Sequence, residues 1–90
     1  MYKVVIADDE KIIQEGLVES IAWEQLGFQI VGCFSDGRDV IDYLDTMPVD
    51  VIITDIVMGH IGGIEIAKYV KTEGLPCKVV FISGFSDFEL

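Results

Sequence analysis

Short runs of β-branched residues alternate along this chain with longer segments in which apolar residues recur every three or four positions. The short runs predict four strands, at residues 3–7, 28–34, 49–54 and 78–83. The longer segments predict three intervening helices, at residues 10–21, 37–47 and 63–74. Strands that alternate with helices indicate a doubly wound α/β fold, with a parallel sheet, right-handed crossovers and helices on both faces.

Each predicted helix has one apolar face. The residues expected to point inward are Ile13, Leu17 and Ile21 in the first helix, Val40, Ile41 and Leu44 in the second, and Ile66, Ala67 and Val70 in the third. Ser35 or Asp36 can cap the second helix, and Gly74 can end the third.

Composition narrows the class of protein. Ninety residues are enough for one domain, and a hydrophobic fraction of 51% suits strands that are buried on both faces. Cys33 and Cys77 both lie beside apolar residues, which predicts reduced thiols in the core rather than a disulfide. With no signal peptide and no apolar run of the roughly 18 residues that a membrane span needs, we expect a cytoplasmic protein without a membrane partner.

The charge is strongly one-sided. Sixteen acidic residues against six basic ones give a formal net charge of -10. Such a surface repels phosphate backbones, so this segment is not expected to bind nucleic acid by itself. It suits cations or a basic partner.

Acidic residues stand at the ends of the predicted strands. Asp8 and Asp9 follow the first strand, and Asp55 follows the third. Because ligands of an open parallel sheet bind at the carboxyl ends of its strands, three carboxylates would converge there if these strands are neighbours. Their repulsion would be relieved by a divalent cation, Mg²⁺ or alternatively Mn²⁺. Taken alone, Asp8 or Asp9 is better explained as a cap of the following helix, where negative charge is favourable; the metal site is inferred from their combination with Asp55 and Ser83.

Asp55 is the candidate nucleophile because it stands alone at its strand end, facing the Asp8–Asp9 pair. A carboxylate can attack phosphorus and become an aspartyl phosphate, and positioning with cationic stabilisation then supplies most of the catalysis. Ser83, at the end of the fourth strand, could donate a hydrogen bond to the phosphoryl oxygens.

The segments "VVIADDE", "VIITDIVM" and "VVFISG" together resemble the receiver domain of two-component response regulators. The sequences of residues 23–28 and 83–90 are similar to those of receivers in regulators with an AraC-type DNA-binding domain. The resemblance implies a flavodoxin-like sheet of strand order 2-1-3-4-5. It also implies that a histidine kinase phosphorylates Asp55. Asp9 would bind Mg²⁺ directly, Asp8 largely through water, the Val57 carbonyl would complete the protein ligands, and Ser83 would be the switch hydroxyl.

Two departures from the family pattern stand out. Gly59 and Gly62 replace the usual proline and aspartate of the loop after the acceptor, which is expected to loosen that loop. The family's lysine, fifth strand and last helix would come after Leu90. We therefore expect residues 1–90 to form one incomplete receiver domain without its effector domain. An exposed fourth strand would favour homodimers or other self-association.

The expected function is that of a phospho-accepting signalling domain, not an enzyme, which switches a transcriptional output and reaches DNA only through a separate effector domain. The alternative is a degenerate receiver that acts as a phosphorylation-independent interaction module. A phosphatase of the haloacid-dehalogenase type is excluded, because that family has a second aspartate where Val57 stands. His60 is interpreted as a solvated loop residue, and Phe85 and Phe88 as either partner contacts or core.

Overall fold

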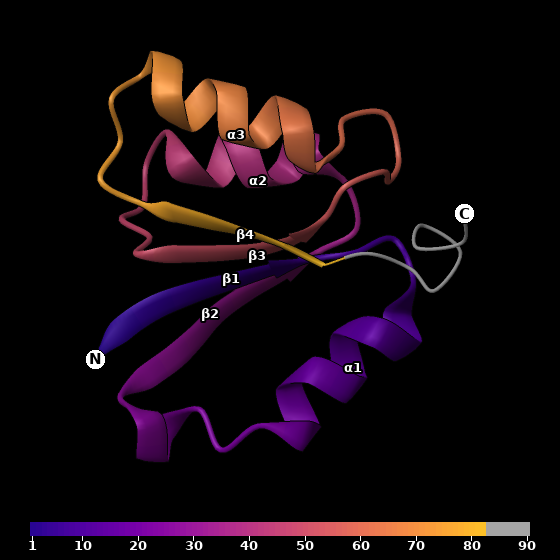
Figure 1. Cartoon of the computed structure of the whole chain (residues 1–90), viewed down its shortest axis with the longest axis vertical. Helices are drawn as coiled ribbons and strands as arrows, with labels where there is room; N and C mark the ends of the chain where they lie inside the picture. Colours follow the sequence, from indigo (N-terminus) through magenta and orange to yellow (C-terminus); the bar gives the residue numbers. More distant parts are fainter. Residues whose placement is uncertain (83–90) are drawn as a thin grey trace.

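The computed structural model describes residues 1–82, so Ser83, Phe85 and Phe88 lie outside the described residues. The elements in chain order are β1 (Tyr2–Ala7), α1 (Lys11–Ser20), the short 3₁₀ helix η1 (Glu24–Leu26), β2 (Phe28–Phe34), α2 (Gly37–Leu44), β3 (Val51–Asp55), α3 (Gly63–Thr72) and β4 (Lys78–Ile82). The sheet lies between two layers of helices, with α2 and α3 on one face and α1 on the other (Figure 1). This arrangement confirms the predicted doubly wound α/β class.

The four strands pair in the order β2-β1-β3-β4, and every pair is parallel. This order matches the first four strands of the predicted 2-1-3-4-5 arrangement. It places β1 and β3 side by side in the centre of the sheet. Residues Val4 to Ala7 of β1 are fully buried, as expected for a central strand covered on both faces.

Several element boundaries differ from the sequence prediction, and one short helix was not predicted. The second helix ends at Leu44 instead of residue 47, and it is followed by a turn in which the Thr46 N–H donates to the Tyr43 carbonyl at 3.2 Å. The third strand starts at Val51, not at residue 49. Helix η1 was not predicted; Gly27, with φ of 89°, leads from it into β2.

The main core lies between the sheet and the α2–α3 layer. Its buried members are Val5, Ala7, Val40, Leu44, Val49, Ile52, Met58, Ile66 and Val70. The inward faces predicted for α2 and α3 are confirmed, with Ile41 and Ala67 half-buried at the margins. Gly74, with φ of 65°, follows the end of α3 as predicted.

The opposite face of the sheet is covered only in its centre. Cys33, Ile6, Ile53 and Val80 form one row across the four strands, because parallel register partners point to the same face. In this row Ile6 is fully buried, whereas Val80 is 47% exposed and Cys33 is also exposed. A single helix, α1, therefore shields the middle strands and leaves the margins open.

Two sequence predictions are wrong on this face. Cys33 is exposed rather than in the core, because it lies on an edge strand and lines a hollow of about 480 Å³ between that strand and α1. In α1, Ile13 is exposed and Leu17 is half-buried, while the buried residue is Gln14. Cys33 and Cys77 are free thiols, as predicted. Among residues 1–82, no helix combines the length and apolar character that a membrane crossing requires.

We expect Ile66→Ala to lower the free energy of unfolding by about 3 kcal/mol, because it opens a cavity in the α2–α3 core. The matched control is Ile12→Ala, which removes the same atoms from a side chain that is 76% exposed, whereas Ile66 is 0% exposed. Urea unfolding at equal protein concentration measures both values. Equal losses in the two variants would contradict the described core.

Candidate functional site

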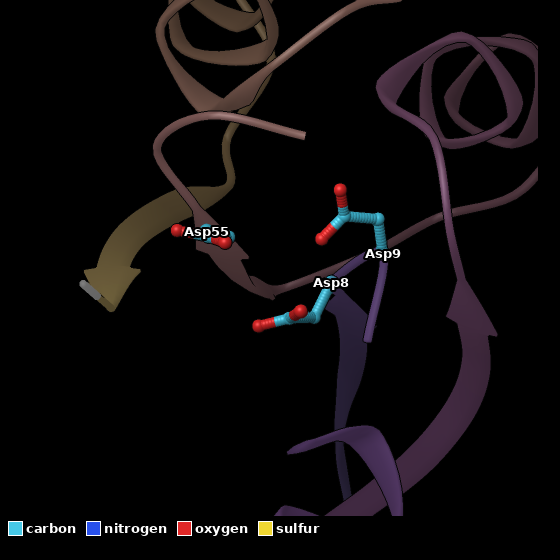
Figure 2. A group of neighbouring side chains, drawn as sticks. All are labelled: Asp8, Asp9 and Asp55. Atoms are coloured by element: carbon cyan, nitrogen blue, oxygen red, sulfur yellow. The ribbon is translucent and has the colours of Figure 1, made fainter. Parts of the chain in front are cut away.

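Three carboxylates meet at the carboxyl ends of two neighbouring strands. Asp8 and Asp9 follow β1, Asp55 ends β3, and the two strands pair up to the Ala7–Thr54 step. One carboxylate oxygen from each residue lies within 4.8 Å of the others. Figure 2 shows the three side chains gathered at this edge of the sheet. The predicted convergence is therefore confirmed.

Asp8 is the buried member of the cluster, with 3% of its surface exposed. Its Oδ1 accepts a hydrogen bond of 2.8 Å from the Glu10 N–H. Burial raises the pKa of Asp8, the Glu10 hydrogen bond opposes this rise, and the charges of Asp55 and Asp9 add to it. The carboxylates thus repel one another in the absence of a cation.

The Glu10 N–H belongs to the N-cap residue of α1, where no side-chain cap bond forms. Asp8 therefore accepts from the backbone of the turn before the helix and does not cap α1, so the alternative interpretation of Asp8 as a helix cap is not borne out. Capping does not explain the cluster as a whole, because Asp55 comes from a different strand.

Asp55 is half-buried, and its Oδ1 accepts a 2.8 Å hydrogen bond from the Ile56 N–H. This bond fixes the orientation of the carboxylate at the strand end. Val57 lies two residues further on in the same loop, with its side chain exposed. Ser83, the predicted switch hydroxyl, is outside the described residues.

Asp36 fastens the loop that follows Asp55 to helix α2. Its carboxylate accepts hydrogen bonds from the N–H groups of Arg38 (3.0 Å), His60 (2.9 Å) and Ile61 (3.2 Å). The first of these bonds confirms Asp36 as the cap of α2, and the other two cross to the loop before α3. Gly59, with φ of 45°, makes room for this contact, since a Cβ there would lie 2.5 Å from Asp36 Oδ2.

His60 is solvated, as predicted, with 95% of its side chain exposed, and its Nδ1 lies 3.1 Å from Asp36 Oδ2. The hydrogen bond from the Arg38 N–H, followed by that from the His60 N–H, lowers the pKa of Asp36 below its ordinary range. The ionised carboxylate is therefore the form that holds α2 and the loop together.

Two residues of the site were missed or only partly identified in the sequence. Asp36 was predicted as a cap, but its contacts with the loop join segments 24 residues apart. Gln14, which contacts the backbone of Asp8, was not singled out. The available signal was a polar residue on the same helix face as Leu17 and Ile21, inside the predicted apolar stripe.

The three carboxylates differ in exposure: Asp9 is exposed, Asp55 is half-buried and Asp8 is buried. Two hollows of about 480 Å³ lie along α1, and the residues lining them do not include Asp8, Asp9 or Asp55. The cluster instead lies at the carboxyl ends of β1 and β3.

We expect the stability that Asp36 supplies to depend on acid. Because the folded-state pKa is lowered, this stability is present at neutral pH and is lost as pH falls through the unfolded and then the folded value. The difference in unfolding free energy between the wild type and Asp36→Asn should shrink from about pH 5 to about pH 2. Asp42→Asn, at an exposed position of α2, is the control. If urea titrations give the same difference in unfolding free energy between the wild type and Asp36→Asn at every pH, the role of the ionised Asp36 in holding α2 and the loop together is contradicted.

We expect Asp8→Asn to stabilise the metal-free chain at neutral pH. The amide keeps an oxygen that accepts from the Glu10 N–H but removes the charge that repels Asp9 and Asp55. The gain should be on the order of 1 kcal/mol in chelator-treated protein. Saturating Mg²⁺ should cancel or reverse it, since the variant loses a ligand charge. A loss of stability in chelator would show that the carboxylates do not repel.

Comparison with known proteins agrees with this geometry. The family model described as the response regulator receiver domain matches residues 4–90. An uncharacterized transcriptional regulatory protein of Bacillus subtilis, YesN, is 34% identical over 89 residues, which are 99% of this chain and 24% of YesN. The chain spans about a quarter to a third of the length of the curated relatives it matches.

Solved structures match as well. The receiver domain of AraT, a response regulator from Geobacillus stearothermophilus, is 38% identical with a TM-score of 0.86, over 97% of this chain and 67% of that one. A two-component transcriptional regulator AraC from Clostridium phytofermentans is 34% identical with a TM-score of 0.82, over the same shares of each chain. The predicted likeness to AraC-type receivers is confirmed. The chain belongs to the response regulator receiver domain family.

Proposed function

We propose that this chain is a phospho-accepting receiver, which takes a phosphoryl group from a sensor histidine kinase onto Asp55 with the help of Mg²⁺. The observation that carries the proposal is the meeting of Asp8, Asp9 and Asp55 within 4.8 Å at the ends of paired strands, in a chain of this family. A lone surface acid would need no such arrangement. The cluster supplies both a nucleophile and a cation site.

The residues present fit a hard divalent cation. Carboxylate and carbonyl oxygens are the ligands that Mg²⁺ and Mn²⁺ prefer. Burial raises the pKa of Asp8 and the charges of Asp55 and Asp9 add to the rise; a cation would offset both effects. Asp9, Asp55 and the Val57 carbonyl would hold the ion directly, and Asp8 largely through water. When bound, the cation would neutralise the charge of the phosphoryl oxygens.

The chain's own part in the transfer is nucleophilic attack and positioning. An oxygen of Asp55 attacks phosphorus, an O–P bond forms, the P–N bond to the kinase histidine breaks, and its electron pair returns to the imidazole. The Ile56 N–H holds the Asp55 carboxylate in place during the attack. Asp36 holds the loop that follows Asp55. The loop therefore does not have to become ordered each time the kinase binds.

The relatives support a proposal about the longer protein to which this chain belongs and about its partners. YesN is a transcriptional regulatory protein, and this chain spans only part of its length. We propose that residues 1–90 are the receiver of a longer cytoplasmic regulator, in which an AraC-type effector domain contacts DNA. Ser83 would transmit the phosphorylated state, and self-association through the exposed β4 margin would form part of the output.

A degenerate receiver remains the second candidate, because Gly59 and Gly62 occupy loop positions where the family has other residues. Such a module would keep the fold and bind a partner without accepting phosphate. Such a module would still contain the cluster of Asp8, Asp9 and Asp55, but Asp55 would not be phosphorylated. Direct phosphorylation separates the two functions.

We expect intact-mass spectrometry to detect a gain of one phosphoryl group after incubation with acetyl phosphate and Mg²⁺. The gain should be absent from Asp55→Asn and after chelation. Asp42→Asn, an exposed aspartate of α2, is the matched control and should be phosphorylated like the wild type. A Mg²⁺-independent gain, or one that persists in Asp55→Asn, would contradict the proposed acceptor. A gain only in a chain extended past Leu90 would mean that the transfer needs residues beyond this segment, and no gain in either chain would favour the degenerate receiver.

A further inference from the structure

Gln14 is buried beside the carboxylate cluster, in an otherwise poorly covered helix. It is the buried residue of α1, with only 4% of its surface exposed. Among residues 1–82, the buried polar side chains are Asp8, Gln14 and Thr54. Burying an amide is unfavourable unless it is hydrogen-bonded, so the contacts of Gln14 indicate why it is there.

The amide nitrogen of Gln14 joins three separate points of the backbone and loops. Nε2 donates to the Asp8 carbonyl at 2.6 Å, lies 3.1 Å from the Phe34 carbonyl and lies 3.3 Å from Ser35 Oγ. The Phe34 carbonyl also accepts from the Asp8 N–H at 3.0 Å. Both backbone groups of Asp8 are therefore fastened to one junction, formed by Gln14 and the end of β2.

This junction lies where the chain leaves β1 and turns into α1. The Asp8 N–H and carbonyl are held by Phe34 and Gln14, while the Asp8 side chain is held by the Glu10 N–H. The direction of the Asp8 and Asp9 side chains depends on this short stretch of backbone. Without the amide, the Asp8 carbonyl would lose a donor, and the turn that carries Asp8 and Asp9 would lose one of its connections to the end of β2.

We propose that Gln14 is a positioning residue of the cation site, which acts through the Asp8 backbone to keep the Asp8 and Asp9 carboxylates turned toward Asp55. The inference rests on the proposed function, since it assigns Gln14 a part in forming that cation site. Gln14 does not contact the cation; it orients groups that do. Supporting contacts of this kind commonly change metal affinity by tenfold or more.

The simpler view is that Gln14 only stabilises the fold. Gln14→Met separates the two views, because methionine keeps the length and volume of the side chain but cannot donate. The matched control is Leu17→Ala, which weakens the packing of the same helix one turn away from the junction. Both variants should lose stability in urea unfolding, but only one should lose affinity for the cation.

Titration calorimetry with Mg²⁺ provides the first measurement. We expect the dissociation constant of Gln14→Met to rise about tenfold and that of Leu17→Ala to stay within about twofold of the wild type. If both variants change affinity in proportion to their loss of stability, the positioning role is overturned. If Gln14→Met does not fold, Gln14→Asn takes its place; its amide is one methylene shorter, so a smaller but specific rise in the dissociation constant is expected.

Amide hydrogen exchange of the metal-free chain provides the second measurement, independent of the proposed function. Gln14→Met should speed exchange at Asp8, Asp9 and Glu10 relative to Leu17→Ala. If the wild type fails to bind Mg²⁺, the proposed cation site is wrong, and the positioning role for that site is overturned with it. Faster exchange at Asp8–Glu10 in that case shows that the junction holds the turn and that only the cation site has failed. Unchanged exchange at Asp8–Glu10 overturns the positioning role even if Mg²⁺ binds.

Discussion

The parallel pairing of β1 with β3 is the constraint on which the rest of this structure depends. It brings the ends of two buried strands together and with them the carboxylates of Asp8, Asp9 and Asp55. Hydrophobic burial of the strands drives this pairing, so the repulsion between the acids is imposed by the fold. A cation bound at the proposed site would relieve that conflict, and the proposed phosphoryl acceptor lies at the same site.

The two faces of the sheet contribute differently. The α2–α3 layer supplies the continuous apolar core, whereas α1 covers the centre of the other face and contributes a hydrogen-bonding amide, Gln14. Polar contacts then fasten the loops around the acids: Gln14 holds the turn after β1, and Asp36 holds the loop after β3. The apolar core between the sheet and the α2–α3 layer therefore supplies most of the stability, whereas Gln14 and Asp36 hold the loops around the acids.

Periodicity and strand-end acids were enough to predict the fold class and, on the condition that the first and third strands are neighbours, the meeting of Asp8, Asp9 and Asp55. The strand order was implied by the resemblance to receiver domains. They could not predict that Cys33 is exposed, because a strand pattern does not tell how far one helix extends over a sheet. Gln14 was missed because its partners come from Asp8 and from the end of β2, 20 residues away. Long-range hydrogen bonds of this kind leave no periodic signal. The roles of Ser83 and of the Val57 carbonyl stay predictions.

The most direct test of the account is a Mg²⁺ titration of the metal-free chain, followed residue by residue in the backbone amide NMR spectrum. The account predicts saturable shifts at Asp8, Asp9, Asp55 and Val57, with the exposed acids of α2, Asp39 and Asp42, unaffected. Shifts of equal size at the α2 acids, without saturation, would mean that Mg²⁺ only screens a surface of net charge -10. That result would contradict a specific cation site at the ends of β1 and β3.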